Sequence, residues 1–284
     1  MNYILQRKLK NAFMLALVSF CAGVAVFPLI SVFVYLFQKG VSALNWDFFT
    51  QLPAPVGSTG GGIGNGLLGS ALLIGMASLV GIPWGVGVGI YLAEPGQKKY
   101  KAVLRFITEL LISTPSIVIG LFAYTIFVMP MKRFSAHAGA ASLVLILVPT
   151  LARTTEGMLR QIPSHIREAG LALGLPRWKV TLFVLVRAGM GGILTGIMLG
   201  IARIAGETAP LLFTALNNQF WPRALDQPIS SLPVQIYTYA ISPFEEWQRM
   251  AYGGAFVLMV LVLSLNLFTR FFLKRKFSSA PGTA

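Results

Sequence analysis

The sequence predicts an all-α membrane protein with six transmembrane helices. Of its 284 residues, 55% are hydrophobic and only 11% are charged, whereas soluble domains carry nearer a quarter of charged residues. The mean hydropathy is +0.72. Uncharged stretches of about 20 residues recur along the chain, and each is long enough to cross a hydrocarbon core of about 30 Å as a helix.

Six such stretches follow one another. The first is preceded by basic residues, as in a signal peptide, but its uncharged run is longer than a typical signal core, so we expect it to be kept as a membrane anchor. The second is rich in glycine, and we expect Pro83 to interrupt it. The expected spans are 13–37, 66–93, 110–131, 134–152, 188–212 and 250–272.

The excess of positive charge sets the expected orientation. The formal net charge is +14, which on a soluble protein would suggest nucleic acid as a partner. Here most of the 23 Lys and Arg residues gather between the apolar stretches on one side of a six-span topology. The positive-inside rule assigns that side to the cytoplasm. We therefore expect cytoplasmic termini, a cytoplasmic loop at 153–187 and no binding to nucleic acid.

The spans also suggest how the chain is organised. An N-terminal part, 1–65, would hold the first span and an outer loop. A core, 66–273, would hold the other five spans and a cytoplasmic loop at about 154–187. A basic cytoplasmic tail, 274–284, would follow. The core is therefore where we look for function.

Motifs for catalysis or cofactor binding are missing from the sequence. Cys21 is the only cysteine, and no Cys/His spacing typical of a metal site occurs. No Gly-Lys-Ser or Gly-Lys-Thr is present, so there is no Walker A loop to bind ATP. Residues 64–69 match the dinucleotide pattern Gly-x-Gly-x-x-Gly but open a membrane span; we interpret them, with Gly85, Gly87 and Gly89, as sites of close helix packing. We expect neither enzyme activity nor a cofactor or metal.

The most informative charges lie within the fifth expected span. Between Arg187 and Arg223 only Arg203 and Glu207 are charged, four residues apart and therefore on one face of the expected helix. Each ionised side chain costs about 2.5–3.5 kcal/mol at mid-bilayer. Either the two neutralise each other and position the helix, or they mark the path of a small anion. Arginine suits the second role, because its planar fork donates paired N–H groups and stays charged.

Two more residues extend the anion hypothesis. Arg153 ends the fourth expected span, where it either snorkels to the cytoplasmic surface or forms an inner charge for a departing anion. Glu156 is close enough in sequence to pair with it. Thr208 offers a hydroxyl donor beside Glu207. The candidate pathway residues are thus Arg203, Glu207, Arg153 and Thr208.

The cytoplasmic loop between the fourth and fifth spans carries a second pattern. It reads EAGLALGLPRWK over residues 168–179. Gly174 suits the left-handed position that ends a helix, and Pro176 suits the start of another, so we expect two short helices joined at a glycine. Small residues would let this hairpin seat closely in a groove of a partner. Alternatively, its basic residues would hold it on anionic lipid as an amphipathic surface helix.

The start of this loop, Glu168-Ala169-Gly170 with Gly174 after three more residues, resembles the Glu-Ala-Ala loop of binding-protein-dependent ABC importer permeases. Gly170 stands where that pattern has its second alanine. Two further segments are similar to the phosphate permeases within the family. They are PSIVIGLF at 115–122 and RIAGETAPLLFTAL at 203–216. The resemblance covers essentially all of the chain after residue 61.

The resemblance implies a type I ABC importer permease fold (MetI-like) in the inner membrane of a bacterial cell. In such permeases the Glu-Ala-Ala loop is the coupling helix that sits in a cleft of the ATPase, which implies this role for Glu168, Ala169, Gly170 and Gly174. The implied partners are a second permease subunit, an ATPase dimer that binds the ATP, a periplasmic phosphate-binding protein and membrane lipid. The implied activity is the import of inorganic phosphate.

Other functions remain compatible with the residues alone. A permease for another oxyanion, such as sulfate or molybdate, would need the same intramembrane arginine. A secondary anion transporter would also use that arginine, but would not need the two-helix loop. A scaffold or sensor subunit that transports nothing would need neither charge of the Arg203–Glu207 pair for uptake.

Overall fold

The computed structural model describes residues 2–55, 60–96, 98–269 and 271, and the regular structure of these residues is entirely helical. The expected all-α class is therefore confirmed. The helices are α1 (Asn2–Gly40), η1 (Val41–Ala43), α2 (Trp46–Thr50), α3 (Gly64–Ala93), α4 (Lys98–Ser113), α5 (Ser116–Ala123), the π-helix η2 (Tyr124–Val128), α6 (Met129–Met131), α7 (Ala136–Arg160), α8 (Ser164–Ala172), α9 (Arg177–Lys179), the π-helix η3 (Val180–Leu185), α10 (Val186–Ala205), α11 (Ala209–Thr214), α12 (Leu232–Ala240) and α13 (Glu245–Phe268).

Five stretches are long and apolar enough to cross a membrane, and a bent pair of helices completes the six expected spans. The five are Tyr3–Ala43, Gly64–Ala93, Ala136–Arg160, Arg177–Ala205 and Glu245–Phe268. The sixth combines Lys99–Ser113 with Ser116–Met131, which meet at an angle of 107°. The chain is thus a polytopic helical membrane protein.

Several expected boundaries were wrong. The third span begins at Lys99 and not near residue 110, and it is bent because Pro115 disfavours helical geometry at the preceding Thr114. Pro83 does not interrupt α3, which continues through it. The fourth span does not end near residue 152 but extends to Arg160. The fifth stops at Ala205 rather than at residue 212.

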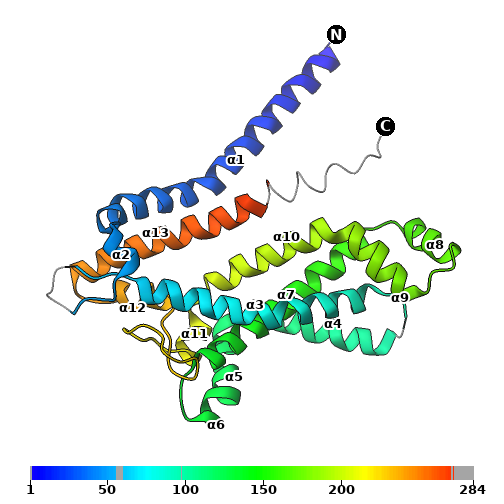
Figure 1. Cartoon of the computed structure of the whole chain (residues 1–284). Coiled ribbons are helices and arrows are strands. Elements are labelled where there is room, and N and C mark those ends of the chain that lie inside the picture. Colours follow the sequence, from blue (N-terminus) through cyan, green and yellow to red (C-terminus); the bar gives the residue numbers. More distant parts are fainter. Residues whose placement is uncertain (1, 56–59, 97, 270, 272–284) are drawn as a thin grey trace.

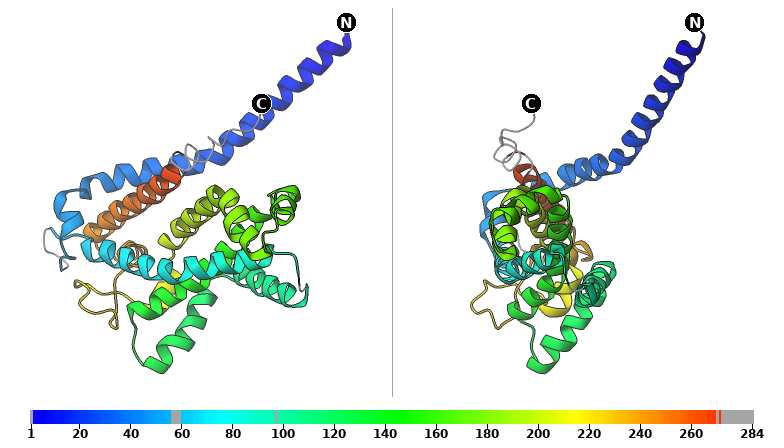
Figure 2. Two further views of the ribbon diagram at one scale, coloured as in Figure 1. Left: turned by 45° about the vertical axis from the view of Figure 1, so that its right-hand side comes forward. Right: turned by 90° about the vertical axis from the view of Figure 1, so that its right-hand side faces the viewer.

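The division of the chain at residues 65 and 273 stays a prediction, although α3 does begin there, at Gly64. The basic tail, 274–284, lies outside the described residues. The first span does not stand alone. Its second half packs along α13 through aromatic contacts such as Phe33 with Phe256 and Tyr35 with Tyr252, while its first half runs away from the bundle (Figures 1 and 2).

The centre of the bundle is the packing of α3 against α7. Small residues recur every fourth position on the buried side of α3, as Ala77, Gly81, Gly85 and Gly89. A Cβ added at Gly81 or Gly85 would lie 2.8 Å from Leu147 Cδ2 or 2.7 Å from Leu151 Cβ. The absence of side chains therefore lets the two helices approach closely.

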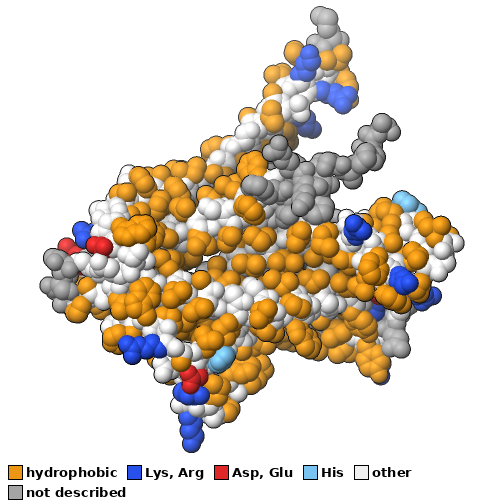
Figure 3. Space-filling model, viewed as in Figure 1, with side chains coloured by type: hydrophobic (Ala, Val, Ile, Leu, Met, Phe, Trp, Pro, Cys, Tyr) orange, Lys and Arg blue, Asp and Glu red, His pale blue; other side chains and the backbone are white. Residues whose placement is uncertain are grey.

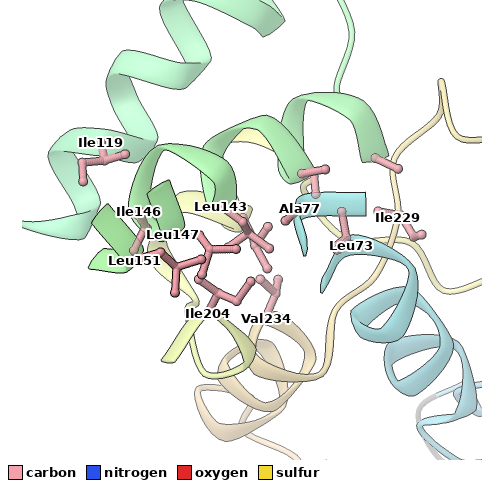
Figure 4. Close-up of a cluster of buried hydrophobic side chains, with 14 residues drawn as sticks. Leu73, Ala77, Ile119, Leu143, Ile146, Leu147, Leu151, Ile204, Ile229 and Val234 are labelled. Atoms are coloured by element: carbon pink, nitrogen blue, oxygen red, sulfur yellow. The ribbon is translucent and has the colours of Figure 1, made fainter. Parts of the chain in front are cut away.

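The core continues from this helix pair into three other elements. Leu143, Leu147 and Leu151 of α7 meet Ile204 of α10, Ile119 of α5 and Val234 of α12 (Figure 4). Helix α10, which carries Arg203, is consequently anchored one residue after that arginine, because Ile204 is only 1% exposed.

The surface agrees with a position in the membrane. Hydrophobic side chains cover much of the viewed face along the length of the bundle, and most Lys and Arg side chains in view gather towards its ends (Figure 3). Exposed aromatic and aliphatic side chains of this kind suit contact with lipid or with another apolar helix. One end of the α3–α7 pair carries α8 and α9 and is called the hairpin end below; the other, which carries α12, is called the opposite end (Figure 1).

Candidate anion pathway and coupling hairpin

The fifth span is broken where the two charges lie. Helix α10 ends at Ala205, and Gly206 caps it with φ −97° and ψ 0°. The next helix, α11, begins at Ala209. Arg203 therefore lies in the last turn of α10, where the helix dipole favours a cation, and Glu207 follows the end of the helix. The expectation that both charges share one continuous helix face was wrong.

The resulting Arg203–Glu207 ion pair is long, and its arginine is partly exposed. Arg203 Nε lies 3.9 Å from Glu207 Oε1, at the limit of an ion pair, and the two side chains are 46% and 16% exposed. Thr208, the next residue, makes no side-chain cap to α11. A guanidinium that is half exposed and not tightly held keeps N–H groups for another acceptor.

The segment beyond the break is fixed by packing. A Cβ added at Gly120 of α5 would lie 2.8 Å from Pro210 Cα, so α5 and α11 pack with their backbones close. At the end of α11, Thr214 Oγ1 lies 3.3 Å from Ser142 Oγ of α7. The structure thus brings together the two segments singled out in the sequence, 115–122 and 203–216, and fixes the segment that follows the break.

Arg153 does not pair as expected. It lies inside α7, and its Nη1 is 3.2 Å from Glu109 Oε1 of α4, with both side chains more than half exposed. Its neighbour Thr154 lies against Gly196 of α10. Arg203 is seven residues beyond Gly196, so the level of Arg153 is about 10 Å from that of Arg203 along α10.

Glu156, the expected partner of Arg153, is buried and belongs to a different cluster. Its Oε1 accepts a hydrogen bond from Arg105 Nε of α4 at 2.7 Å and forms an ion pair with Arg160 Nη2 at 2.9 Å. The carboxylate is 2% exposed. Arg105 and Arg160 occupy this carboxylate, although positions 153 and 156 are near enough on α7 to pair.

The loop between the fourth and fifth spans forms the expected two-helix hairpin. Helix α8 ends near Gly174, whose φ of +77° is left-handed, and Pro176 precedes α9. Glu168, Ala169 and Gly174 are exposed, and Leu173 at the turn is 81% exposed. Gly170 instead faces inward, where a Cβ would lie 3.1 Å from both methyl groups of Val180.

Sequence reasoning missed Glu94, the residue after the end of α3. Its carboxylate accepts hydrogen bonds from Arg167 Nη1 of α8, 3.0 Å from each oxygen, and from Thr181 Oγ1 of η3. Its backbone carbonyl accepts one from Lys101 Nζ of α4. The sequence did contain a signal for Glu94, because the chain has only 9 Asp and Glu residues. An acidic residue that adjoins an apolar span in such a chain is expected to have a specific partner.

Comparison with known proteins identifies a family model and relatives that match this chain. The family model of binding-protein-dependent transport system inner membrane components matches residues 85–278. The chain is 46% identical over 271 residues to the phosphate transport system permease protein PstA of Yersinia pestis, covering 95% of this chain and 92% of that one.

Solved structures match in fold. A bacterial alginate ABC transporter in complex with an alginate pentasaccharide-bound periplasmic protein matches with a TM-score of 0.65 at 13% identity, over 95% of this chain and 97% of that chain. The MetNI methionine ABC transporter in inward-facing conformations matches with a TM-score of 0.55 at 19% identity, over 76% and 93%.

Proposed function

We propose that this chain, which belongs to the family of binding-protein-dependent transport system inner membrane components, is the permease subunit through which an ATP-driven importer moves inorganic phosphate into the cytoplasm. The observation that carries the proposal is the helix break after Arg203, which leaves a half-exposed guanidinium in a membrane span. The fold is the expected ABC importer permease (MetI-like) fold. The relatives named for phosphate transport support the choice of ion.

Arg203 would act as the principal hydrogen-bond donor to the phosphate ion. Phosphate must exchange its water for other hydrogen-bond donors in order to cross, and a guanidinium presents two parallel N–H groups to such an oxyanion. Transport also requires release. Glu207, 3.9 Å away, competes for the same donors and balances the charge of the empty pathway. Its carboxylate can also accept the proton of singly charged phosphate, and the Thr208 hydroxyl adds a donor.

Arg153 would act further along the same route. Its level lies about 10 Å from that of Arg203 along α10, on the side of the hairpin end. Its partner Glu109 is as exposed as Arg153 itself, so the pair can open to an anion at little cost. Two staggered arginines, each with a nearby carboxylate, give weak sequential sites instead of one tight site.

The exposed charges require a partner surface. An ionised side chain facing lipid at mid-bilayer costs about 2.5–3.5 kcal/mol, so Arg203 and Arg153 must face a water-filled path closed by another protein. We propose a second, PstC-like permease subunit there. A PstS-like periplasmic phosphate-binding protein would deliver the ion. The subunit would lie in the bacterial inner membrane with both termini in the cytoplasm, as the distribution of Lys and Arg favours.

The hairpin would be the contact through which ATP hydrolysis in a partner ATPase drives movement of this chain. Glu168, Ala169 and Gly174 are exposed on it, and we propose that they seat in a PstB-like ATPase dimer, which binds and hydrolyses the ATP. Gly170 would contribute indirectly, by letting α8 lie against Val180. This chain would then need no catalytic residue, metal or cofactor of its own.

Uptake of radiolabelled phosphate into proteoliposomes containing the whole complex, with loaded binding protein outside and ATP inside, tests the proposal. We expect Arg203→Ala to lower the uptake rate by about 10²-fold and Arg203→Lys to restore it only partly, because lysine cannot form the paired contact. Arg223→Ala, outside the spans, is the control. Normal uptake by Arg203→Ala would reject this site.

The same assay separates the alternatives. Excess sulfate or molybdate should leave phosphate uptake unchanged; strong competition through the matched binding protein would favour the broader oxyanion permease. Uptake that persists without ATP would favour a secondary anion transporter. A chain that only senses or scaffolds would tolerate loss of both Arg203 and Glu207 without a change in rate.

A further inference from the structure

Glu94 connects the end of α3 to both sides of the hairpin. Arg167 comes from α8, before the turn at Gly174, and Thr181 comes from η3, after it. Two donors that reach one carboxylate from two sides fix the rotation of the hairpin as well as its distance from α3. Charge-assisted hydrogen bonds of this kind are directional and roughly twice as strong as neutral ones.

Apolar packing alone would leave that rotation less defined. The underside of the hairpin, including Val180 and Leu185, packs on Val86, Ile90 and Ala93 of α3. Such contacts resist separation but are non-directional. Beside them lies a cavity of about 230 Å³ lined by Pro95, Gly96, Arg167, Leu171, Arg177 and Val180. The hairpin therefore has room to tilt, and the Glu94 contacts are what oppose the tilt.

Movement at Glu94 would not stay local. Helix α3 is packed backbone-close to α7 through Gly81, Gly85 and Gly89, and a Cβ at Gly89 would lie only 2.5 Å from Thr155 Cβ. Helix α7 in turn carries Arg153 and packs on α10, which carries Arg203. Rigid close-packed helices transmit displacement instead of absorbing it.

We propose that Glu94 is the positioning residue through which a displacement of the hairpin by the ATPase reaches α3 and the charged pathway. The inference rests on the proposed function, because it takes the hairpin as the ATPase contact. It predicts that loss of the Glu94 carboxylate uncouples the complex: the hairpin still seats in the ATPase and ATP is hydrolysed, but less of the movement reaches the pathway.

The coupling ratio is the decisive measurement. In proteoliposomes with loaded binding protein, we expect Glu94→Ala to raise the ATP hydrolysed per phosphate imported roughly tenfold, the size of a typical coupling between sites. The double variant Glu94→Arg with Arg167→Glu should bring the ratio back towards the wild-type value. Asp226→Ala, which removes an exposed carboxylate paired with Arg133, is the matched control and should leave the ratio unchanged.

The outcomes separate this inference from the proposed function. An unchanged ratio in Glu94→Ala, or uptake and hydrolysis that fall in parallel, overturns the positioning role while the wild-type complex still imports phosphate. If the wild type fails to import phosphate, the proposed function fails instead, and a second measurement still tests Glu94.

Spin labels at Leu173 and Leu79, in a Cys21→Ser background, report the distance between hairpin and α3 whatever the transported ion is. Both positions are about 80% exposed. We expect a broader distance distribution in Glu94→Ala than in the wild-type sequence, and an equally narrow one would reject the inference.

Discussion

The two ends of the α3–α7 pair are held by different chemistry. At the opposite end, α3 meets α12 and the chain before it through glycine and neutral hydrogen bonds. Asn65 Nδ2 donates to the Asn218 carbonyl at 2.6 Å, and the Leu232 amide donates to Ser70 Oγ at 2.8 Å. At the hairpin end, α3, α4, α7 and α8 meet through Glu94 and Glu156, whose carboxylates form ion pairs with arginines.

The two ends therefore differ in how they respond to displacement. We call the opposite end the frame, because it is rigid, and the hairpin end the joint, because it can be displaced. Backbone-close glycine contacts tolerate almost no displacement, because any shift either opens a void or causes a collision. Buried Tyr239, which accepts from Gln235 Nε2 at the opposite end, has its pKa raised by burial, an effect opposed only in part by that hydrogen bond, so the network stays neutral. At the hairpin end, directional charged contacts keep α8 linked to α3, so a displacement of the hairpin moves α3 with it.

The largest loss of stability should come from a substitution in the frame, at the opposite end of the α3–α7 pair. We expect Gly69→Val to destabilise the chain by about 3 kcal/mol or more, because even its Cβ would collide with the Ser230 carbonyl oxygen, which is backbone and cannot rotate away. Thermal unfolding in detergent measures the loss. The control is Gly75→Val, since nothing lies within 4 Å of a Cβ at Gly75. Equal stability of the two variants would contradict the rigid frame.

A smaller effect is expected at the joint. Glu156→Gln keeps the volume of the buried side chain but removes the charge that Arg105 and Arg160 share. A fully buried pair would lose about 3–5 kcal/mol, but these arginines are 31% and 54% exposed and can turn to water, so we expect about 1–2 kcal/mol.

Salt dependence identifies the cause of that loss. The stability difference between the wild-type chain and Glu156→Gln should shrink in about 1 M salt, which screens exposed charges. Glu246→Gln, an exposed carboxylate in the first turn of α13, is the control and should change little. A salt-independent loss would point to packing in place of charge.

The sequence predicted what depends on composition and short patterns. Uncharged length gave the spans, and the glycine and proline positions gave the hairpin with its left-handed Gly174. Spacing also located Arg203 and Glu207, although it placed them on one helix. The break at Gly206 had a local signal that the spacing argument did not use, since Gly206 suits a helix end and Pro210 suits a helix start. Only the packing of α5 against Pro210, between segments some 90 positions apart, lies beyond any local pattern.

The pairing of charges was beyond the sequence for a similar reason. Arg153 has Glu156 three residues away, yet it pairs with Glu109, because α4 packs against α7 in the folded chain. Glu94 and Arg167 are separated by 73 positions. A tertiary contact such as Arg153–Glu109 overrides the i,i+3 pairing that an isolated helix would favour.

A neutral hydrogen bond at the opposite end offers a third comparison. Ser70→Ala removes the acceptor of the Leu232 amide at the start of α12, and we expect a loss of about 1 kcal/mol. High salt should not change that loss, in contrast to the loss at Glu156. The control is Ser113→Ala, whose hydroxyl bonds only within its own exposed helix turn. A salt-sensitive loss in Ser70→Ala would contradict the view that neutral contacts stabilise the frame and charged contacts stabilise the joint.

The smallest effect should occur at Gly87, which lies between two packed glycines of α3 but faces outward. Nothing lies within 4 Å of a Cβ at Gly87, so it is not a packing glycine within this chain, contrary to our interpretation of the sequence. Alanine favours a helix over glycine by up to about 1 kcal/mol. We therefore expect Gly87→Ala to unfold at the same temperature as the wild-type chain or slightly above it. A clear loss of stability in the isolated chain would contradict this. A loss only in the assembled complex would instead mean that a partner helix lies against this face, as close as α7 lies against the other.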